Sequence, residues 1–147
     1  MSTPTAYMPV VLVIDDEPVI RDVIRSSLEG RGYSVLGAAS GAEAVRLACA
    51  HGDDIRLALI ELRLPDWGGA TLGRALREIR PGLPCGYITW GLGNPAEPLL
   101  RKPFTCTELA GFVARLVAAE GDPARIDRAG PVRLTPYSHH LRRAGLS

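Results

Sequence analysis

The sequence predicts an α/β fold in which a parallel β-sheet is covered by helices on both sides. Apolar runs typical of strands alternate with segments of helical period from about residue 9 to residue 119, a pattern typical of parallel sheets with helical crossovers. The first run, residues 10–14, is entirely apolar and rich in β-branched residues, as expected for a strand buried on both faces. At 147 residues, 46% of them hydrophobic, the chain has the size of one domain with a complete core.

The first half of the domain is expected to contain three strands and two helices. After the first strand, a helix is predicted by apolar residues at helical spacing followed by two glycines that end it. These residues are Ile20, Val23, Ile24, Leu28, Gly30 and Gly32. Residues 33–38 predict a second strand, and a capping box at Ser40 and Glu43 begins a helix that extends to about His51. Residues 57–60 predict the third strand.

The second half is expected to add a helix, two strands and a final helix. Turn-forming residues 65–69 precede the helix, which Pro81 closes. Its apolar positions are Leu72, Leu76 and Ile79. Residues 85–89 predict a fourth strand and residues 99–101 a short fifth strand. A second capping box, Thr105 to Glu108, begins a helix with one apolar face.

Three segments are therefore expected: a short tail of residues 1–8, a domain over residues 9–119, and a C-terminal tail of residues 120–147. In residues 121–147 the apolar period is lost, and five arginines against two aspartates give a local charge of +3 (5 − 2). Such a segment offers little apolar surface to bury, so we expect a tail and not a second domain.

The composition argues against several classes of function. A net charge of +1 gives no reason to expect a nucleic acid or an anionic membrane as a partner. No apolar stretch is long enough to span a membrane, and the first residues lack the pattern of a signal peptide. The three cysteines, Cys49, Cys85 and Cys106, have no metal-ligand spacing and are expected to be small hydrophobic residues in a reducing compartment. A cytoplasmic protein is expected.

Polar side chains follow the ends of the predicted strands, where open α/β sheets bind their ligands. They are Asp15, Asp16 and Glu17 after the first strand, Glu61 after the third, Thr89 after the fourth and Lys102 after the fifth. Convergent carboxylates suit a hard divalent cation such as Mg²⁺, and a hydroxyl and an ammonium suit a phosphoryl group. Lys102 is the one lysine among 17 basic residues, which indicates a need for a compact point charge there.

These motifs resemble the CheY-like receiver domain of bacterial response regulators, over about residues 9–119. They are Val-Leu-Val-Ile-Asp15-Asp16-Glu17-Pro18, Leu-Arg-Leu-Pro65-Asp-Trp-Gly-Gly69, Thr89 and Lys102-Pro103-Phe104. The resemblance implies a flavodoxin-like, doubly wound five-stranded sheet with strand order 2-1-3-4-5. It implies metal ligands at Asp15, Asp16 and the backbone carbonyl of Arg63, a switching hydroxyl at Thr89 and a phosphate-binding ammonium at Lys102.

The chain departs from the family pattern at three site positions. The family's phosphoryl acceptor is an aspartate, and Glu61 stands at the matching position, with its carboxylate one methylene further out. In-line phosphoryl transfer depends on positioning, so a displaced acceptor makes phosphorylation improbable. Trp90 follows Thr89 where a small residue is usual, and we expect it to block the pocket. Leu99 replaces the usual switch aromatic.

A further departure is a short connection between the fourth and fifth strands. Nine residues separate Thr89 from Leu99, whereas a parallel crossover normally needs a dozen or more. We therefore expect the helix between these strands, the fourth of the family, to be lost or reduced. Its loss is expected to expose Tyr87, Leu92, Leu99 and Leu100.

These observations predict an atypical, phosphorylation-independent receiver domain that acts by protein–protein interaction in two-component or phosphorelay signalling. The expected partner is a signalling protein, such as a histidine kinase or another regulator, with a homodimer, no nucleic acid and no membrane. We expect no enzyme activity and no required cofactor, with weak or vestigial Mg²⁺ binding at Asp15, Asp16, Glu61 and Arg63. The alternative is a conventional Mg²⁺-dependent phosphoacceptor. A small hydrolase is disfavoured because the sequence lacks a phosphatase motif and a Ser–His or Cys–His arrangement.

We expect the C-terminal tail to dock on the exposed sheet face and to support the dimer. Its apolar residues are Val132, Leu134, Tyr137, Leu141 and Leu146.

Overall fold

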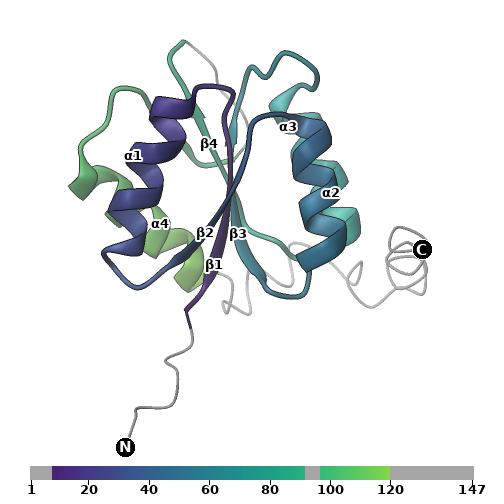
Figure 1. Cartoon of the computed structure of the whole chain (residues 1–147), viewed down its shortest axis with the longest axis horizontal. Coiled ribbons are helices and arrows are strands. Elements are labelled where there is room, and N and C mark those ends of the chain that lie inside the picture. The colour runs from purple at the N-terminus through teal and green to yellow at the C-terminus, as the bar shows by residue number, and fades with distance from the viewer. Residues whose placement is uncertain (1–7, 92–96, 120–147) are drawn as a thin grey trace, which may run out of the picture.

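The protein is described here by a computed structural model that covers residues 8–91 and 97–119 (Figure 1). The expected C-terminal tail, most of the expected N-terminal tail and Leu92 lie outside the described residues. Five strands form one parallel sheet in the order β2-β1-β3-β4-β5. The strands are β1 (Val10–Ile14), β2 (Ser34–Ala38), β3 (Ile55–Glu61), β4 (Cys85–Thr89) and β5 (Leu99–Arg101). The predicted flavodoxin-like fold and strand order are confirmed.

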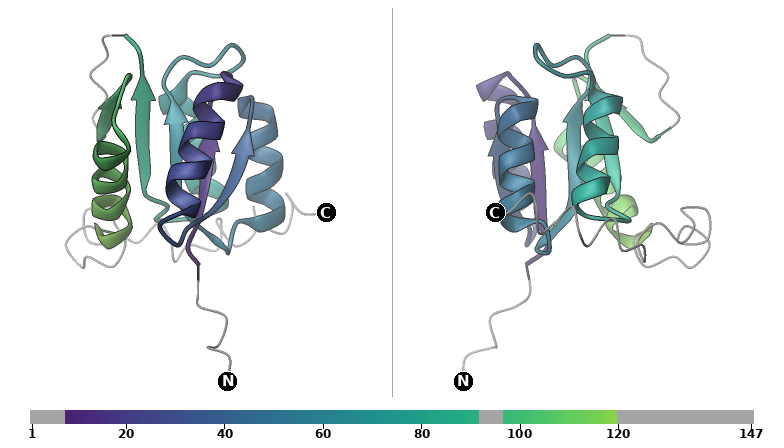
Figure 2. Two further views of the ribbon diagram at one scale, coloured as in Figure 1. Left: turned by 60° about the vertical axis from the view of Figure 1, so that its left-hand side comes forward. Right: turned by 90° about the vertical axis from the view of Figure 1, so that its right-hand side faces the viewer.

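Helices cover both faces of the sheet, two on each side (Figures 1 and 2). They are α1 (Pro18–Glu29), α2 (Gly41–His51), α3 (Gly69–Ile79) and α4 (Cys106–Ala119). α1 and α4 lie on one face, and α2 and α3 on the other. No described residue between β4 and β5 is helical, so α4 of this chain directly follows β5. Within residues 8–91 and 97–119, no helix is long and apolar enough to cross a bilayer.

Two predicted capping boxes form at helix starts. The Ser40 hydroxyl accepts a hydrogen bond from the Glu43 backbone N–H (3.1 Å), and the Glu43 carboxylate accepts one from the Ala39 N–H (2.8 Å). Thr105 and Glu108 exchange such bonds directly, at 3.0 and 2.8 Å. Each box satisfies N–H groups that the first helical turn leaves unpaired, and so fixes where α2 and α4 leave the sheet.

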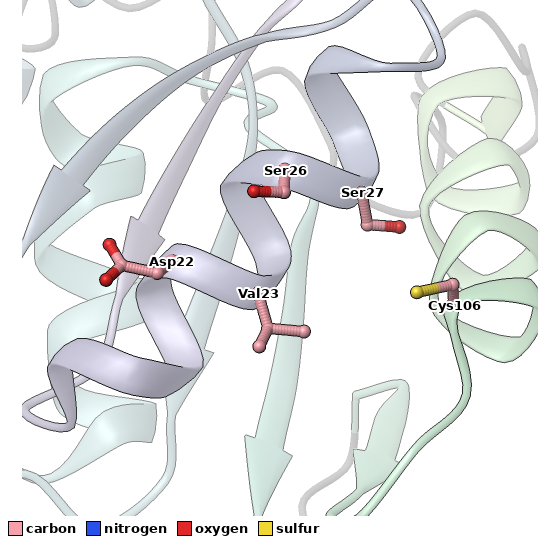
Figure 3. A pocket seen from close by; sticks show the side chains of 5 residues that line it. All are labelled: Asp22, Val23, Ser26, Ser27 and Cys106. Carbon is pink, nitrogen blue, oxygen red and sulfur yellow. The ribbon is translucent and has the colours of Figure 1, made fainter.

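The face under α1 and α4 is packed with residues that alternate along the central strands. Val11 and Val13 of β1 point to this side, together with Leu57 and Leu59 of β3. Beyond this core, a hollow between α1 and α4 is lined by Asp22, Val23, Ser26, Ser27 and Cys106 (Figure 3). The hollow contains none of the polar residues found at the strand ends.

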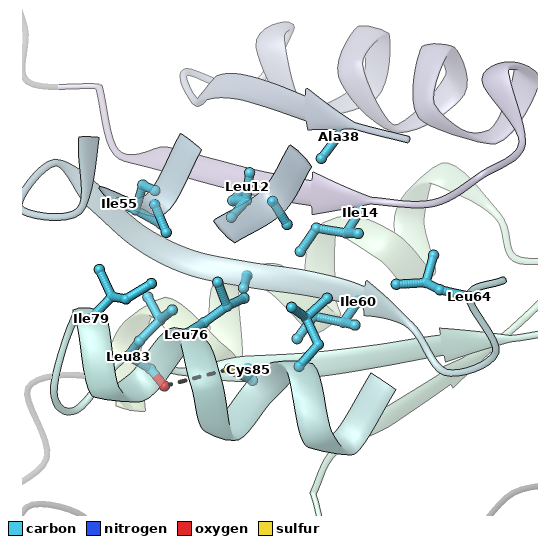
Figure 4. Packing of buried hydrophobic residues seen from close by; sticks show 14 of the residues in the cluster. Leu12, Ile14, Ala38, Ile55, Ile60, Leu64, Leu76, Ile79, Leu83 and Cys85 are labelled. Carbon is cyan, nitrogen blue, oxygen red and sulfur yellow. Dashed lines mark hydrogen bonds between the residues drawn. The ribbon is translucent and has the colours of Figure 1, made fainter. Parts of the chain in front are cut away.

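The opposite face, under α2 and α3, contains the larger group of buried side chains (Figure 4). Leu12 and Ile14 of β1 point to this side, as expected from the alternation of side chains along a strand. Tyr87 of β4 lies here too and is 1% exposed. The expectation that loss of a crossover helix would expose Tyr87 is therefore wrong. The reason is Gly73 of α3, which leaves room for the Tyr87 ring and hydroxyl against the helix.

The end of the sheet near β5 is closed on this side by an ion pair. The Arg77 guanidinium of α3 donates through both terminal nitrogens to the Glu97 carboxylate, one bond being 2.7 Å, and its Nε donates to the Leu83 carbonyl (3.0 Å). Leu99 and Leu100 are half-buried and pack against the two cores. Of the residues expected to be exposed, Tyr87 is therefore buried, and Leu99 and Leu100 are partly covered.

Gly73→Ala should test how tightly Tyr87 and α3 are packed. A Cβ at Gly73 would overlap the Tyr87 hydroxyl, whereas the nearest ring atom, Cζ, would be 3.4 Å away. We expect a loss of about 1–3 kcal/mol in the free energy of unfolding, measured by urea denaturation. In a Tyr87→Phe background the overlap is absent and the substitution should be neutral or stabilising, since alanine favours helix. Equal losses in both backgrounds would contradict this packing.

Candidate functional site

The polar residues predicted at the strand ends meet at one edge of the sheet. Asp15 directly follows β1, Glu61 is the last residue of β3 and Lys102 directly follows β5. Glu17 is the N-cap residue of α1, with Pro18 in the first helical turn fixing the start of the helix. Because parallel strands end at the same edge, residues distant in sequence come within hydrogen-bond distance of one another.

The Lys102 ammonium lies among three carboxylates. Its Nζ is 2.7 Å from Asp15 Oδ2, 2.7 Å from Glu61 Oε1 and 2.9 Å from Glu17 Oε1. The contacts to Glu61 and Glu17 are hydrogen bonds, and the contact to Asp15 is an ion pair without hydrogen-bond alignment. The side chains of Lys102 and Asp15 are fully buried, that of Glu61 is 6% exposed and that of Glu17 is 45% exposed.

These contacts shift the pKa values of the charged groups. Burial raises the pKa of Asp15, and the neighbouring Lys102 offsets part of this rise. Burial alone would lower the pKa of Lys102, but its close contacts with the three carboxylates and their negative charge raise it well above its ordinary value. Lys102 is therefore cationic at any physiological pH. The hydrogen bond from Lys102, and then the one from Trp90, lower the pKa of Glu17.

Backbone N–H groups hold the two buried carboxylates in place. The Glu17 N–H donates to Asp15 Oδ1 (2.9 Å), and the Arg63 N–H donates to Glu61 Oε2 (2.9 Å). Each carboxylate thus accepts from the residue two positions later with one oxygen and contacts Lys102 with the other. The pattern is that of an Asx-type turn, extended by one methylene at Glu61. The longer side chain is thereby folded back onto its own loop.

Trp90 covers the solvent side of this cluster. Its indole Nε1–H donates to Glu17 Oε1 (2.8 Å), and the ring centroid is 5.6 Å from Lys102 Nζ, within range of a cation–π interaction. The Trp90 residue itself is 55% exposed. The predicted covering of the pocket mouth therefore has a specific anchor, the Glu17 carboxylate.

The structure brings together most, but not all, of the predicted site residues. Asp16 is exposed and lies outside the acidic group, which consists of Asp15, Glu17 and Glu61. Glu17, which follows the first strand in the sequence, takes the place in this group that was predicted for Asp16. Pro18 was an available signal, because a proline at the helix start identifies the preceding residue as an N-cap at the edge of the sheet.

Thr89 and Leu99 lie beside the cluster without entering it. Thr89 is buried, its hydroxyl accepts a long hydrogen bond from the Gly91 N–H (3.4 Å), and its carbonyl accepts one from the Lys102 N–H (2.9 Å). Leu99 packs against the core under α2 and α3. The Thr89 carbonyl thus links the end of β4 to the backbone of Lys102.

The residues present do not fit a divalent cation in this arrangement, although their chemistry is suitable. Asp15, Glu17 and Glu61 each offer a carboxylate oxygen, and these atoms lie within 4.8 Å of one another, as hard cations require. The Lys102 ammonium lies within 2.9 Å of all three side chains and so occupies their common point of contact. Asp16, which the family resemblance assigned as a ligand, is not in the group.

The loop after β3, which begins directly after Glu61 and contains Arg63, is fixed to α2. The Asp66 carboxylate accepts hydrogen bonds from the N–H groups of Gly41 (3.0 Å) and Ala42 (3.1 Å) at the first turn of that helix. The Trp67 ring lies against Gly41, where a Cβ would overlap it. This double attachment limits how far the loop can move to reposition Glu61.

Comparison with known proteins places this fold and site in one family. The family model for the response regulator receiver domain matches residues 11–110. A receiver domain protein of Methanospirillum hungatei, described as CheY-like, has a similar structure, with a TM-score of 0.68 and 25% identity over 77% of this chain and 96% of that chain. The chain belongs to the response regulator receiver domain family.

Two curated relatives extend the comparison beyond the domain. The transcriptional regulatory protein AruR of Pseudomonas aeruginosa is 48% identical over 138 residues, covering 82% of this chain and 56% of that protein. The DNA-binding response regulator MtrA of Mycolicibacterium smegmatis is 30% identical over 145 residues, covering 92% of this chain and 62% of that protein. The chain thus spans about three fifths of the length of these relatives.

These relatives correct the partners expected from the sequence. We expected a signalling protein and a second copy of the chain, with nucleic acid excluded by the low net charge. That exclusion is wrong, because related proteins are named as transcriptional regulators and as DNA-binding. The physical reason is that the net charge describes this chain alone, and this chain matches only part of each relative. It therefore cannot exclude nucleic acid as a partner.

The attachment of the loop to α2 should depend on pH. The N–H groups of Gly41 and Ala42 lower the pKa of Asp66 below its ordinary value of 3.8. A lowered folded-state pKa adds stability that is present above the ordinary value and is lost as the pH falls through the folded-state value. Asp66→Ala should therefore lower the melting temperature at about pH 7, and this effect should shrink as the pH falls below the ordinary value of 3.8. A deficit that persists at low pH would show that the carboxylate charge is not responsible.

The ion pair between Lys102 and Glu61 should show strong coupling. Lys102→Met leaves Asp15 and Glu61 buried without a cation and should lower the free energy of unfolding by about 3 kcal/mol. Glu61→Gln leaves Lys102 paired with Asp15 and Glu17 and should cost less. In the double variant, measured by denaturant unfolding, the loss should be smaller than the sum of the two single losses, because Asp15 is then the one buried carboxylate of the cluster without its cation. Glu17→Gln is the control: because this carboxylate is half-exposed, the loss should be below about 1 kcal/mol. Additive losses at Glu61 and Lys102 would show that the two groups do not interact.

Proposed function

We propose that this chain is an atypical receiver domain that works in two-component signalling without phosphorylation. The observation that carries the proposal is the 2.7 Å hydrogen bond between the buried Lys102 ammonium and Glu61, at the position of the family's aspartate. Within this proposal, residues 9–119 form the receiver domain, flanked by tails of residues 1–8 and 120–147, and the protein acts in the cytoplasm. It is a regulator and not an enzyme.

Two features of Glu61 oppose phosphoryl transfer. Its carboxylate lies one methylene further from the backbone than that of an aspartate, and misplacement by about 1 Å can cost on the order of a hundredfold in rate. Both of its oxygens are also in use, one by Lys102 and the other by the Arg63 N–H. A phosphodonor would have to displace one of these partners before Glu61 could attack it.

The same cluster argues against a strong requirement for Mg²⁺. Phosphoryl transfer relies on a cation to neutralise developing charge, and the carboxylates that would hold this cation already contact Lys102. We propose that Mg²⁺ binds weakly, by competition with the ammonium. Asp15 and Glu61, together with the Arg63 carbonyl, remain candidate vestigial ligands, and Asp16 could contribute only after rearrangement.

A conventional phosphoacceptor is the alternative, and Thr89 favours it. A buried hydroxyl at the end of β4 and an ammonium after β5 are the groups that the family resemblance assigns to the phosphoryl group. Leu99 at the switch position and Trp90 at the pocket mouth weigh against this alternative. Under the first proposal, Thr89 and Lys102 keep a structural role in joining β4 to β5.

Incubation with acetyl phosphate and Mg²⁺, followed by intact mass measurement, separates the two proposals. We expect wild-type protein to gain no phosphate, because Glu61 is misplaced and occupied. Glu61→Asp is the matched variant: it restores the shorter carboxylate, and we expect it to gain one acid-labile phosphate, with Trp90→Ala added if the indole limits access. A stable phosphate on Glu61 of the wild-type protein would contradict the proposal and support the conventional phosphoacceptor.

A further inference from the structure

We propose that Glu17 is a latch that holds Trp90 as a lid over Lys102. Glu17 then acts as a positioning residue that controls access to the charged cluster. This proposal goes beyond the absence of phosphorylation. It concerns the access of dissolved molecules to the Lys102 ammonium, whereas the proposed function concerns phosphorylation of Glu61. It predicts that the buried lysine becomes reactive when one exposed hydrogen bond is removed.

A single carboxylate oxygen joins the buried and exposed parts of the site. Glu17 Oε1 accepts from Lys102 Nζ at 2.9 Å and from Trp90 Nε1 at 2.8 Å. Movement of Glu17 therefore disturbs both the lysine and the indole. Asp15 and Glu61, in contrast, contact Lys102 and accept hydrogen bonds from the backbone N–H groups two residues further along the chain.

The pattern of exposure gives the direction from which the lysine can be reached. Of its three ion-pair partners, Glu17 is the one that is largely exposed, at 45% of its side chain. Trp90 is 55% exposed, while the Lys102 side chain has no exposure at all. A reagent approaching from solvent on this side thus meets the indole and the Glu17 carboxylate before the ammonium.

Different contacts hold the Trp90 indole and the backbone next to it. The next residue, Gly91, donates to the Thr89 hydroxyl and accepts from an Arg101 guanidinium nitrogen at 2.6 Å. Within the described part of the chain, the hydrogen bond of the Trp90 side chain is the one to Glu17. Breaking that bond leaves the backbone anchored and lets the ring rotate away, which is the behaviour of a lid.

The chain offers a direct measure of lid opening, because Lys102 is its one lysine. Acylation with acetic anhydride, followed by mass spectrometry, reports reaction at Lys102, and the N-terminal α-amine serves as the reference in the same molecule. We expect slow acylation of Lys102 in wild-type protein. Glu17→Ala and Trp90→Phe should each raise its rate relative to the reference by about tenfold, the effect expected for one charge-assisted hydrogen bond.

Two control variants separate the latch from simpler effects. Glu17→Gln removes the charge but keeps an oxygen that can accept from the indole. It therefore measures the part of any acceleration that comes from weaker electrostatic stabilisation of the Lys102 ammonium, and Glu17→Ala should exceed it. Asp16→Ala removes an exposed carboxylate next to the site without touching Lys102, and should stay near wild type. Circular dichroism verifies that each variant is folded, and the reference amine corrects for differences in reagent reactivity.

Each outcome decides the proposal. Acceleration by Glu17→Ala and Trp90→Phe that clearly exceeds that of Glu17→Gln supports the latch. If Glu17→Gln accelerates acylation as much as Glu17→Ala, the charge of Glu17 and not its bond to Trp90 protects Lys102, and the latch is overturned. If Trp90→Phe matches wild type, the ring covers the lysine without the hydrogen bond, which also overturns it. None of these readouts uses a phosphodonor, so failure here leaves the test at Glu61 independent.

Discussion

The ammonium of Lys102 is the interaction on which the edge of this domain depends. It follows β5, and its carboxylate partners come from the end of β1, the start of α1 and the end of β3. Without that cation, three acidic groups within 4.8 Å of one another would repel at a buried site. The positions of the three strand ends are thus set by one side chain as well as by the sheet hydrogen bonds.

The packing of the sheet below Lys102 explains why its ammonium is buried away from water. Side chains on β1 and β3 alternate between two apolar cores, so both faces near the strand ends are sealed by α1 and α4 or by α2 and α3. The exposed groups of the cluster, Glu17 and Trp90, lie at the edge of the sheet. Burial strengthens each ion pair and raises the cost of leaving one unmade, so the buried cation depends on the carboxylates around it.

The fold was predictable because periodicity and capping boxes are local signals, and the strand-end rule then brought Asp15, Glu61 and Lys102 together. What the sequence missed depends on contacts between distant elements. Tyr87 was expected to be exposed, yet a glycine on a different helix makes room for it. Asp16 was placed in the pocket instead of Glu17, because the turn between strand and helix decides which of the consecutive acidic side chains faces inward.

Within the proposed function, the occupied cluster also distinguishes this domain from a receiver that awaits a phosphoryl group. A site that transfers a phosphoryl group has cationic groups with few partners in the resting protein. The incoming anion then gains contacts that the resting protein lacks. Here Lys102 already has three carboxylate partners, and both oxygens of Glu61 are occupied. An incoming phosphoryl group would have to break existing bonds to make similar ones, so it would gain little from binding. Within the proposed function, the resting cluster is therefore the working state of the domain, and regulation must act on what surrounds it.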